Sequence, residues 1–518
     1  MEKQKIILTG ILIGVLSFLV HLSVLSDYPV SWDYHFHYYG GLYHLGLPVP
    51  SFSDPSPVPF TAPDPRLTVA DPFGPFLSIV PTLSQIIFHE KLNLLPFDSA
   101  YNLPSVLLGS MGVGLMYIFL AESVGISSGL IGALFLFLFP YYFGHTHINM
   151  KDIPNAFVFA LSVYFFWKFE RKLKITILVA AVLTFAFAFN YKINSAVIPV
   201  ICFLWLIWTG PGILRKINRK FILVSLYFIA APVAALSIWW MFWSTPLLKL
   251  FEILKLFSVN TIGMPVLYFG GIYQSCFNIP LSYPYGSLLS ITPFIILISF
   301  ITGALVVLQG FLKREKFPSL LVFWFFVPLL RYLHPQVCAI DGVRHFMEVI
   351  YPYIAIAAIG FIYIIKKTGE KFGKRNSAVI LTVIAVISLS YNIIRTHPYQ
   401  MNFYGIFAGT SDSDLFDGDM WGTSQKEAAE WLNRNAPKGS FVNIAMAQST
   451  AALYLRDDLL LNLNKKDLEE SDYTVVLNRK SFFEKLNLSQ FVEEKIAGGK
   501  VLYKKTISGR VMFWIFLN

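Results

Sequence analysis

Long runs of apolar residues, separated by short charged or Pro/Gly-rich breaks, recur along the 518-residue chain. Most of these runs approach the ~20 residues that an α-helix needs to cross the hydrocarbon core of a bilayer. The pattern predicts a mainly α fold, a polytopic transmembrane helical bundle. Its roughly eleven spans are expected near 6–25, 103–121, 126–143, 154–170, 173–190, 195–210, 221–243, 286–309, 318–331, 347–365 and 377–394.

Composition supports the same class, because 55% of the residues are hydrophobic and only 14% are charged, against roughly a quarter charged in soluble proteins. The net charge of +10 does not indicate nucleic acid, since the basic residues form no single patch interleaved with aromatics on a soluble face. They fall in short clusters between apolar runs, the positive-inside pattern. These clusters include Lys168, Arg171, Lys172 and Lys174; Arg215, Lys216, Arg219 and Lys220; and Lys366, Lys367, Lys371, Lys374 and Arg375.

Placing every basic cluster in the cytoplasm puts the N-terminus inside and the C-terminus outside the cell (plasma or inner) membrane. Residues 27–102 then form the first outer loop, in which 75–90 is apolar enough to lie flat in the interface or dip into the membrane. The other outer segments are 144–153, 244–285 and 332–346. We expect a membrane domain over residues 1–395.

Residues 396–518 have mixed polarity and are predicted to form a small extracytoplasmic α/β domain. The segment Ser424-Gln425-Lys426-Glu427 reads as a capping box ahead of a helix. Short β-like runs follow at 441–444, 473–477 and 500–503. Cys276 and Cys338 both fall in outer segments, where a disulfide between them is chemically permitted.

The first outer loop contains Asp33 among aromatic and histidine residues. On a helix, Asp33, His37 and His44 would share one face together with Gly40, and could form a site. The alternative is an interfacial aromatic belt in which Asp33 caps a helix.

A second polar segment, 144–153, contains His145, His147 and Asp152 and lies on the same predicted side as Asp33. Asp152 is followed by Pro154, which also suits a helix cap and first turn. The two His-x-His pairs could bind a divalent metal, with His35 and His147 as ligands beside an aspartate. The alternative is histidines that are hydrogen-bonded at the headgroup level.

Lys192, Arg331 and the segment Asp341-Gly342-Val343-Arg344-His345 also lie at the predicted outer face. Basic residues there run against the positive-inside bias, so a lipid-linked phosphate is a plausible partner in chemical terms. Snorkelling, or an ion pair with Asp341, is the alternative.

Asp412, Asp414, Asp417 and Asp419 cluster along the chain but fail the spacing of a calcium-binding EF-hand loop. A solvated acidic turn is expected.

Three of these features together resemble the GT-C superfamily of polyprenyl-phosphate-sugar-dependent glycosyltransferases: the acid Asp33 in the first outer loop, the His-rich hinge ending in Asp152-Ile153-Pro154, and Lys192 between the fifth and sixth spans. The likeness is to the protein O-mannosyltransferase and aminoarabinose transferase branch (family 39-like) and is best in the N-terminal half. The segments Asp341 to His345, His397 to Gln400 and Asp419 to Gly422 also look like parts of such enzymes.

The resemblance implies that Asp33 acts as the base or positions the acceptor, and that Asp152 is the acid of the second outer loop. The mannosyltransferase pattern has a Glu after the first Asp, whereas this chain has Tyr34, so a protein acceptor does not follow from the likeness.

We therefore expect transfer of a sugar from a polyprenyl-phosphate donor to a glycan, lipid or protein hydroxyl, with inversion. Asp33 and Asp152 are the expected catalytic residues. The alternatives are a transporter or flippase of lipid-linked saccharide and a non-catalytic glycan-binding membrane protein. The expected substrate-binding residues are His37, His145, Lys192, Arg331, Arg344 and His345.

Overall fold

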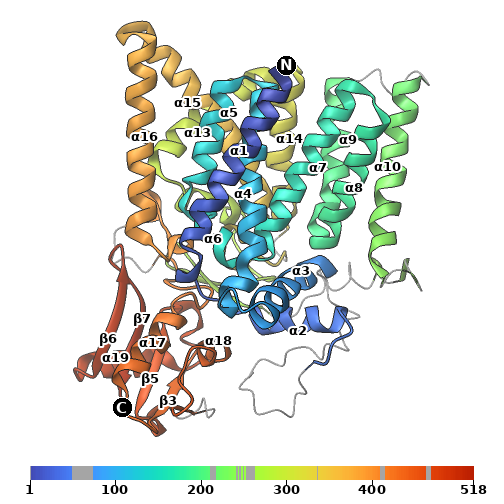
Figure 1. The fold of residues 1–518 in the computed structure, drawn as a ribbon. Helices are drawn as coiled ribbons and strands as arrows, with labels where there is room; N and C mark the ends of the chain where they lie inside the picture. The colour runs from blue at the N-terminus through green and yellow to red at the C-terminus, as the bar shows by residue number, and fades with distance from the viewer. Residues whose placement is uncertain are drawn as a thin grey trace.

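A bundle of long helices and a smaller α/β layer at one end of it make up the molecule in the computed structural model (Figure 1). Two residues of the predicted cytoplasmic clusters, Arg215 and Lys216, and two of the acidic cluster, Asp412 and Asp414, fall outside the described residues. The structure describes residues 2–49, 74–210, 218–240, 243, 245, 247–248, 250–251, 263–334, 337–408, 415–462 and 468–518.

Each predicted span overlaps a helix of the bundle. Among the described residues, seven helices are long and apolar enough to cross a membrane, or up to eight if the bent pair α5 and α6 counts as one span. The fold prediction of a polytopic helical bundle is confirmed. The bundle helices are α1 (Glu2–Ser23), α4 (Phe97–Ser123), α5 (Ile126–Phe137), α6 (Pro140–Ile148), α7 (Asp152–Lys172), α8 (Ile175–Tyr191), α9 (Val197–Thr209), α10 (Arg219–Ile238), α13 (Phe294–Leu312), α14 (Lys316–Leu330), α15 (Ile350–Phe372) and α16 (Lys374–Thr396).

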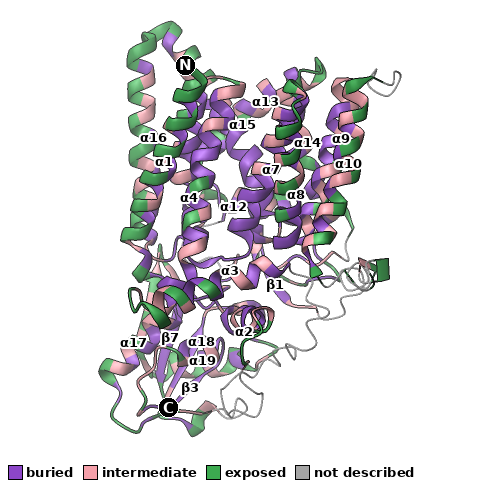
Figure 2. Cartoon of the chain, turned by 45° about the vertical axis from the view of Figure 1, so that its right-hand side comes forward, coloured by how far each residue is buried: buried purple, intermediate pink, exposed green. Residues whose placement is uncertain are grey.

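Burial divides the bundle into a packed interior and an apolar outer surface. Helices α7 and α15 are mostly buried, whereas α1, α10 and α16 present exposed residues along their length (Figure 2). The exposed side chains of the peripheral helices are largely apolar, for example Leu8, Ile229 and Ile387. Such a surface is suited to lipid rather than water.

The span predicted over 126–143 is bent rather than one straight helix, because the helix breaks after Phe137. Pro140 begins α6, and α5 and α6 meet at an angle of 60°. Proline has no N–H to continue the helical hydrogen bonds and favours a helix's first turn. The bend turns α6 across the end of the bundle, where it carries His145 and His147 toward the hinge before α7.

Two short helices, α2 (Tyr34–His44) and α3 (Pro75–Gln85), lie across the end of the bundle that carries the α/β layer (Figure 1). Helix α3 continues as a π-helix over Ile86–Lys91 and packs against α2, α4 and α8. It does not run through the bundle, so the basic clusters keep the single side that the charge pattern predicts.

The five-stranded sheet of the outer layer has the order β4-β3-β5-β7-β6, with β3 parallel to β4 and β5 and with antiparallel pairs β5–β7 and β7–β6. The runs predicted at 441–444, 473–477 and 500–503 match β3, β5 and β6. Its elements are β3 (Phe441–Ile444), β4 (Leu460–Leu461), β5 (Tyr473–Leu477), β6 (Val501–Ile507), β7 (Arg510–Leu517), α17 (Gln425–Asn435), α18 (Gln448–Ala452) and α19 (Leu488–Ala497).

The predicted capping box at the start of α17 is wrong. Ser424 holds the N-cap position, but its hydroxyl donates to Asp419 (2.7 Å), and Glu427 accepts hydrogen bonds from Tyr503 (2.8 Å) and Lys505 (2.9 Å). The solvated acidic turn is also wrong for its described members, since Asp417 and Asp419 are buried. Asp419 instead organises the loop before α17.

A short hairpin, β1 (Pro265–Tyr268) and β2 (Gly271–Gln274), and the helix α12 (Tyr283–Ser290) lie between α10 and α13. The disulfide that the sequence permits is present: Cys276, just after β2, is bonded to Cys338. This bond ties the hairpin to the loop that leads into the segment Gly342–Val349.

Candidate functional site

Polar and charged side chains from six segments gather at the end of the bundle beside the α/β layer. These segments are the start of α2, the hinge between α6 and α7, the turn after α8, residues 341–349, the loop 417–424 ahead of α17, and the turn after β5. Because they are far apart in sequence, only the folded bundle brings their side chains together. The residues involved include Asp33, Asn149, Lys151, Asp152, Lys192, Asp341, Arg344, Trp421 and Arg479.

Asp33 stands at the N-cap position of α2, but its side chain makes no capping hydrogen bond. The carboxylate turns instead to the Lys151 ammonium, with which it forms a close ion pair, and lies 3.9 Å from the Arg344 guanidinium. The Asp33 side chain is 39% exposed, whereas those of Lys151 and Arg344 are 6% and 10% exposed. An accessible carboxylate therefore rests on two enclosed cations, and the capping interpretation is wrong.

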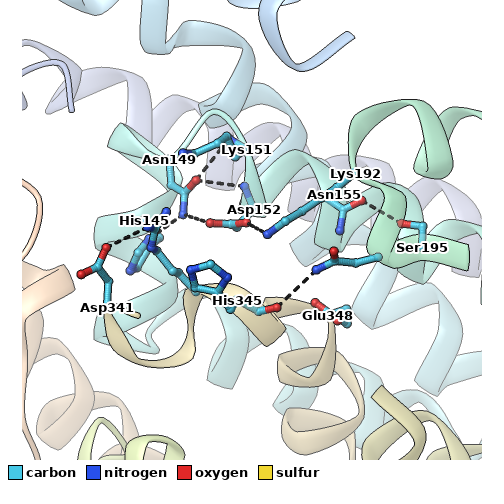
Figure 3. A network of polar contacts seen from close by, with 12 residues as sticks. His145, Asn149, Lys151, Asp152, Asn155, Lys192, Ser195, Asp341, His345 and Glu348 are labelled. Atoms are coloured by element: carbon cyan, nitrogen blue, oxygen red, sulfur yellow. Dashed lines mark hydrogen bonds and ion pairs between the residues drawn. The ribbon is translucent and has the colours of Figure 1, made fainter. Parts of the chain in front are cut away.

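The hinge before α7 is fixed by Asn149. Its Oδ1 accepts the backbone N–H groups of Lys151 (3.1 Å) and Asp152 (2.9 Å), so Asn149 performs the capping once expected of Asp152. Its Nδ2 donates to the Asp152 carboxylate and to His145 Nδ1, both at 2.9 Å (Figure 3). Because an amide nitrogen can only donate, Nδ1 of His145 is an acceptor.

Asp152 is only 2% exposed and receives the Lys192 ammonium on its other oxygen at 2.5 Å (Figure 3). Burial lowers the pKa of Lys192, and the Asp152 carboxylate acts against this shift. A buried charge is tolerated when it is paired and hydrogen-bonded. Asp152 and Lys192 are therefore an enclosed, mutually neutralising pair.

Arg344 links the bundle to the α/β layer. Its guanidinium bonds Asp341 at 2.8 Å, and Asp341 also accepts Arg479 (2.8 Å) and the Trp421 indole N–H (3.1 Å). The Trp421 ring lies beneath two cations, with the Arg344 guanidinium 4.8 Å and the Lys151 ammonium 5.4 Å from its centre. Trp421 thus supports both cations that contact Asp33.

Arg331 and His345 are both electrostatic neighbours of Lys192. The Arg331 guanidinium pairs with Glu348 at 3.2 Å and donates to the backbone carbonyl of His345. Burial, reinforced by Arg344 and Lys192, holds the pKa of His345 well below its usual range. His345 is therefore neutral at physiological pH.

The histidines proposed as metal ligands do not converge. His147 stacks on Tyr28 (3.9 Å between ring centres) and contacts His21 at 3.3 Å, while His35 packs edge-on against Tyr34 and Tyr39. The part of the chain that the structure describes holds no group of three or more His, Cys, Asp or Glu side chains arranged for a metal ion. The predicted ligand set, His35 and His147 beside an aspartate, therefore does not fit a metal ion.

His37 is buried one turn into α2, where its ring faces Ser78 of α3.

Sequence reasoning did not single out Lys151, Asn149, Trp421 or Arg479. Two of them carried a signal: Lys151 is a basic residue beside Asp152 on the predicted outer side, and Trp421 lies in the segment Asp419 to Gly422 that resembles GT-C enzymes.

The match to known families covers residues 97–240, which fit the family described as dolichyl-phosphate-mannose-protein mannosyltransferase. This region includes Asp152 and Lys192 but not Asp33. A search of the curated proteins gave no match.

Two solved structures resemble the whole chain. ArnT from Cupriavidus metallidurans in the apo state shares 11% identity at a TM-score of 0.52, over 99% of this chain and 98% of that one. The apo oligosaccharyltransferase of Archaeoglobus fulgidus shares 13% identity at a TM-score of 0.50, over 95% of this chain and 68% of that one. Both are polytopic GT-C membrane proteins. The chain has the fold of the GT-C superfamily. This fold agrees with the resemblance drawn from the sequence.

Proposed function

We propose that this GT-C protein is a membrane glycosyltransferase that moves a sugar from a polyprenyl-phosphate donor to an acceptor hydroxyl at the outer membrane face. One observation carries the proposal: Asp33 is exposed enough to meet a substrate, yet it lies against two enclosed cations. A base beside positive charge is what this reaction needs, because a hydroxyl must lose a proton while a phosphate leaves as an anion.

In the proposed step the acceptor oxygen attacks the anomeric carbon of the sugar. The bond between that carbon and the phosphate oxygen breaks, and its electron pair leaves with the polyprenyl phosphate. Asp33 takes the proton of the acceptor hydroxyl. Atoms and charge balance with no further reactant.

Lys151 and Arg344 are suited to stabilise the departing phosphate. Both flank Asp33, and their enclosure removes water that would otherwise screen them. Lys192 and Arg331, also expected to hold phosphate, are engaged with Asp152 and Glu348. We assign the phosphate first to Lys151 and Arg344, with Arg331 and His345 at the edge of the site.

We assign Asp152 a positioning role rather than that of base. It is enclosed, it neutralises Lys192, and its contact with Asn149 fixes the hinge that carries Lys151. His145 and His37 stand behind this hinge and α2, where they orient the neighbouring groups.

Inversion at the anomeric centre follows from a single displacement. A retaining double displacement would need a second free carboxylate about 5 Å from the first. Asp152, the other expected catalytic acid, is neutralised by Lys192 and is nearly inaccessible.

The donor class is supported by the family description, whose dolichyl-phosphate-mannose is a sugar on a polyprenyl phosphate. The acceptor is a hydroxyl of a glycan, lipid or protein. With the basic clusters in the cytoplasm, the site faces outward from the plasma or inner membrane.

Replacing Asp33 by Asn tests the proposal. Asn keeps the size of the side chain but cannot accept the proton, so transfer should fall by on the order of 10²–10⁴-fold. The measurement is product formation by purified protein with a panel of polyprenyl-phosphate sugars, read by mass spectrometry. Asp27→Asn is the matched control, since Asp27 is an exposed aspartate nearby that pairs with His397. Undiminished turnover by Asp33→Asn would remove Asp33 from the chemistry.

A further inference from the structure

A groove of about 380 Å³ lies where the bundle meets the α/β layer, and Asp33 is not among its lining residues. Its walls are the start of α13, the last turns of α16, the segment 402–406, and the tip of the β6–β7 hairpin. The groove is thus shared between the membrane helices and the α/β layer. Its polar lining includes Ser388, Asn392, Arg395, Asn402 and Arg510.

Arg395 is the exposed basic residue of this groove. Its guanidinium lies over the rings of Tyr391 (5.4 Å) and Phe403 (5.8 Å), and no carboxylate in the described part of the chain pairs with it. It stands on the last turn of a membrane helix at the outer face, where the positive-inside bias disfavours arginine. Such a residue is stabilised by an anion at headgroup depth.

A second guanidinium faces the same volume. Arg510 lies over the Tyr404 ring at 4.2 Å and donates to the carbonyl of Ala408. Planar guanidinium groups bind phosphate oxygens in pairs of hydrogen bonds. The positive end of α13, which begins at Phe294, adds to the same field.

Asn402, another residue of the groove lining, has a side-chain oxygen that lacks a hydrogen-bond donor within the part of the chain that the structure describes. The Thr423 hydroxyl gives its proton to Asp419, so its oxygen must accept the Asn402 amide N–H at 3.2 Å. This fixes the orientation of the Asn402 amide. Its Oδ1 is buried and has no hydrogen-bond partner among the described residues. A buried acceptor without a partner is costly, so a ligand that also carries a donor is favoured.

We propose that this groove binds the headgroup of a phospholipid of the outer leaflet, with the phosphate on Arg395 and Arg510 and an ammonium donor toward Asn402. Phosphatidylethanolamine has both groups. The two helices that wall the groove carry exposed apolar side chains, including Phe294, Ile298 and Ile387, along which acyl chains can lie. The bound lipid would bridge the β6–β7 hairpin to the bundle.

The test is lipid binding to the purified full-length protein, measured by native mass spectrometry with phosphatidylethanolamine and phosphatidylcholine of the same chains. Arg395→Gln should weaken phosphatidylethanolamine binding about tenfold, the loss of one charge-assisted contact. Arg375→Gln is the matched control, because Arg375 is exposed on the same helix at its other end. It should bind as the unaltered protein does.

Phosphatidylcholine, which has the phosphate but no N–H donor, should bind more weakly than phosphatidylethanolamine. Equal binding of the two lipids would overturn the role of Asn402. Unchanged binding by Arg395→Gln, an equal loss in Arg375→Gln, or displacement of the lipid by inorganic phosphate would overturn the lipid site. None of these outcomes depends on glycosyl transfer, so the proposed function is tested separately.

Discussion

The ionisation of Asp33 is governed by its two cationic neighbours. Burial acts to raise the pKa of Asp33, but Lys151 and Arg344 outweigh it and hold that pKa well below its usual range. The carboxylate is therefore ionised at every pH at which the protein is expected to work. Asp33 is therefore a weak base in the resting site. It becomes a stronger base as Lys151 and Arg344 turn to the charge that develops on the leaving phosphate, and this favours proton transfer to Asp33.

Lys151→Gln tests this balance. Removing the ammonium raises the pKa of Asp33, so protonation of Asp33 begins at a higher pH and the acid limb of the kcat/KM profile moves upward in pH. The measurement is transfer rate against pH. Lys168→Gln removes a lysine that is paired with Glu122 instead and should leave the limb in place. A lower rate with an unmoved limb would contradict the proposed coupling.

We expect the Asp152–Lys192 pair to stabilise the fold rather than to contact the substrate. Asp152→Asn leaves the Lys192 ammonium buried without its counter-charge, which should destabilise the protein by about 3–5 kcal/mol. Adding Lys192→Met removes the stranded charge, so the double variant should be more stable than Asp152→Asn alone.

Thermal unfolding of the variants in one detergent measures this coupling. Lys367→Gln is the control, since both members of the Lys367–Glu370 pair are exposed and the loss of this pair should leave the unfolding temperature nearly unchanged. A double variant no more stable than the single one would show that Lys192 does not depend on Asp152 for its charge.

At the scale of the helix and loop, the apolar runs predicted where the bundle helices lie, although only seven or eight helices among the described residues are long and apolar enough to cross a membrane. The bend at Pro140 was missed because a proline near the end of an apolar run is equally compatible with a kinked span. Strand β7 was missed because it is buried on both faces over Met512 to Phe516, and a continuous apolar run lacks the alternation that marks a strand.

The candidate site was predictable in part. Arg344 stood out because basic residues are unusual at the predicted outer face, and Asp33 and Asp152 because each lies in a polar segment with histidines. Their partners did not, since Arg344 meets Trp421 and Arg479 only through tertiary contacts between distant segments. The Asp419 loop was misread because consecutive acids look solvated, whereas Asp419 is satisfied by the N–H groups of Trp421, Thr423 and Ser424.

That loop makes the α/β layer part of the candidate site. Trp421 donates its indole N–H to Asp341 and lies under the cations of Arg344 and Lys151. Trp421→Phe keeps a ring for the cations but loses the donor, and Trp421→Ala loses both. Transfer should therefore fall in the order unaltered protein, Trp421→Phe, Trp421→Ala.

The measurement is kcat and KM for the donor, since misplaced cations should affect the leaving phosphate and hence kcat. Trp431→Phe is the control, because Trp431 stacks on Tyr503 within the α/β layer and should change neither value. Equal losses for Trp421→Phe and Trp421→Ala would mean that only the hydrogen bond to Asp341 matters.

The two ends of the helical bundle carry different groups of residues. The lysine- and arginine-rich junctions α7–α8, α13–α14 and α15–α16 lie at the end of the bundle away from the α/β layer (Figure 1). Asp33, Asp152 and the sheet lie at the other end. Because basic loops remain in the cytoplasm, the candidate site and the sheet should face outward together.

Single cysteines at exposed lysines test that orientation. Lys438→Cys, in the α/β layer, should react with an impermeant maleimide on intact cells, whereas Lys367→Cys, on α15, should react only after permeabilisation. The native cysteines should react little with the maleimide, since Cys276 and Cys338 are bonded to each other and Cys202 is buried. The reverse labelling pattern would place Asp33 in the cytoplasm. A carboxylate there could not meet a donor presented at the outer leaflet, so the proposed outer-face transfer would have to be abandoned even if the fold assignment stands.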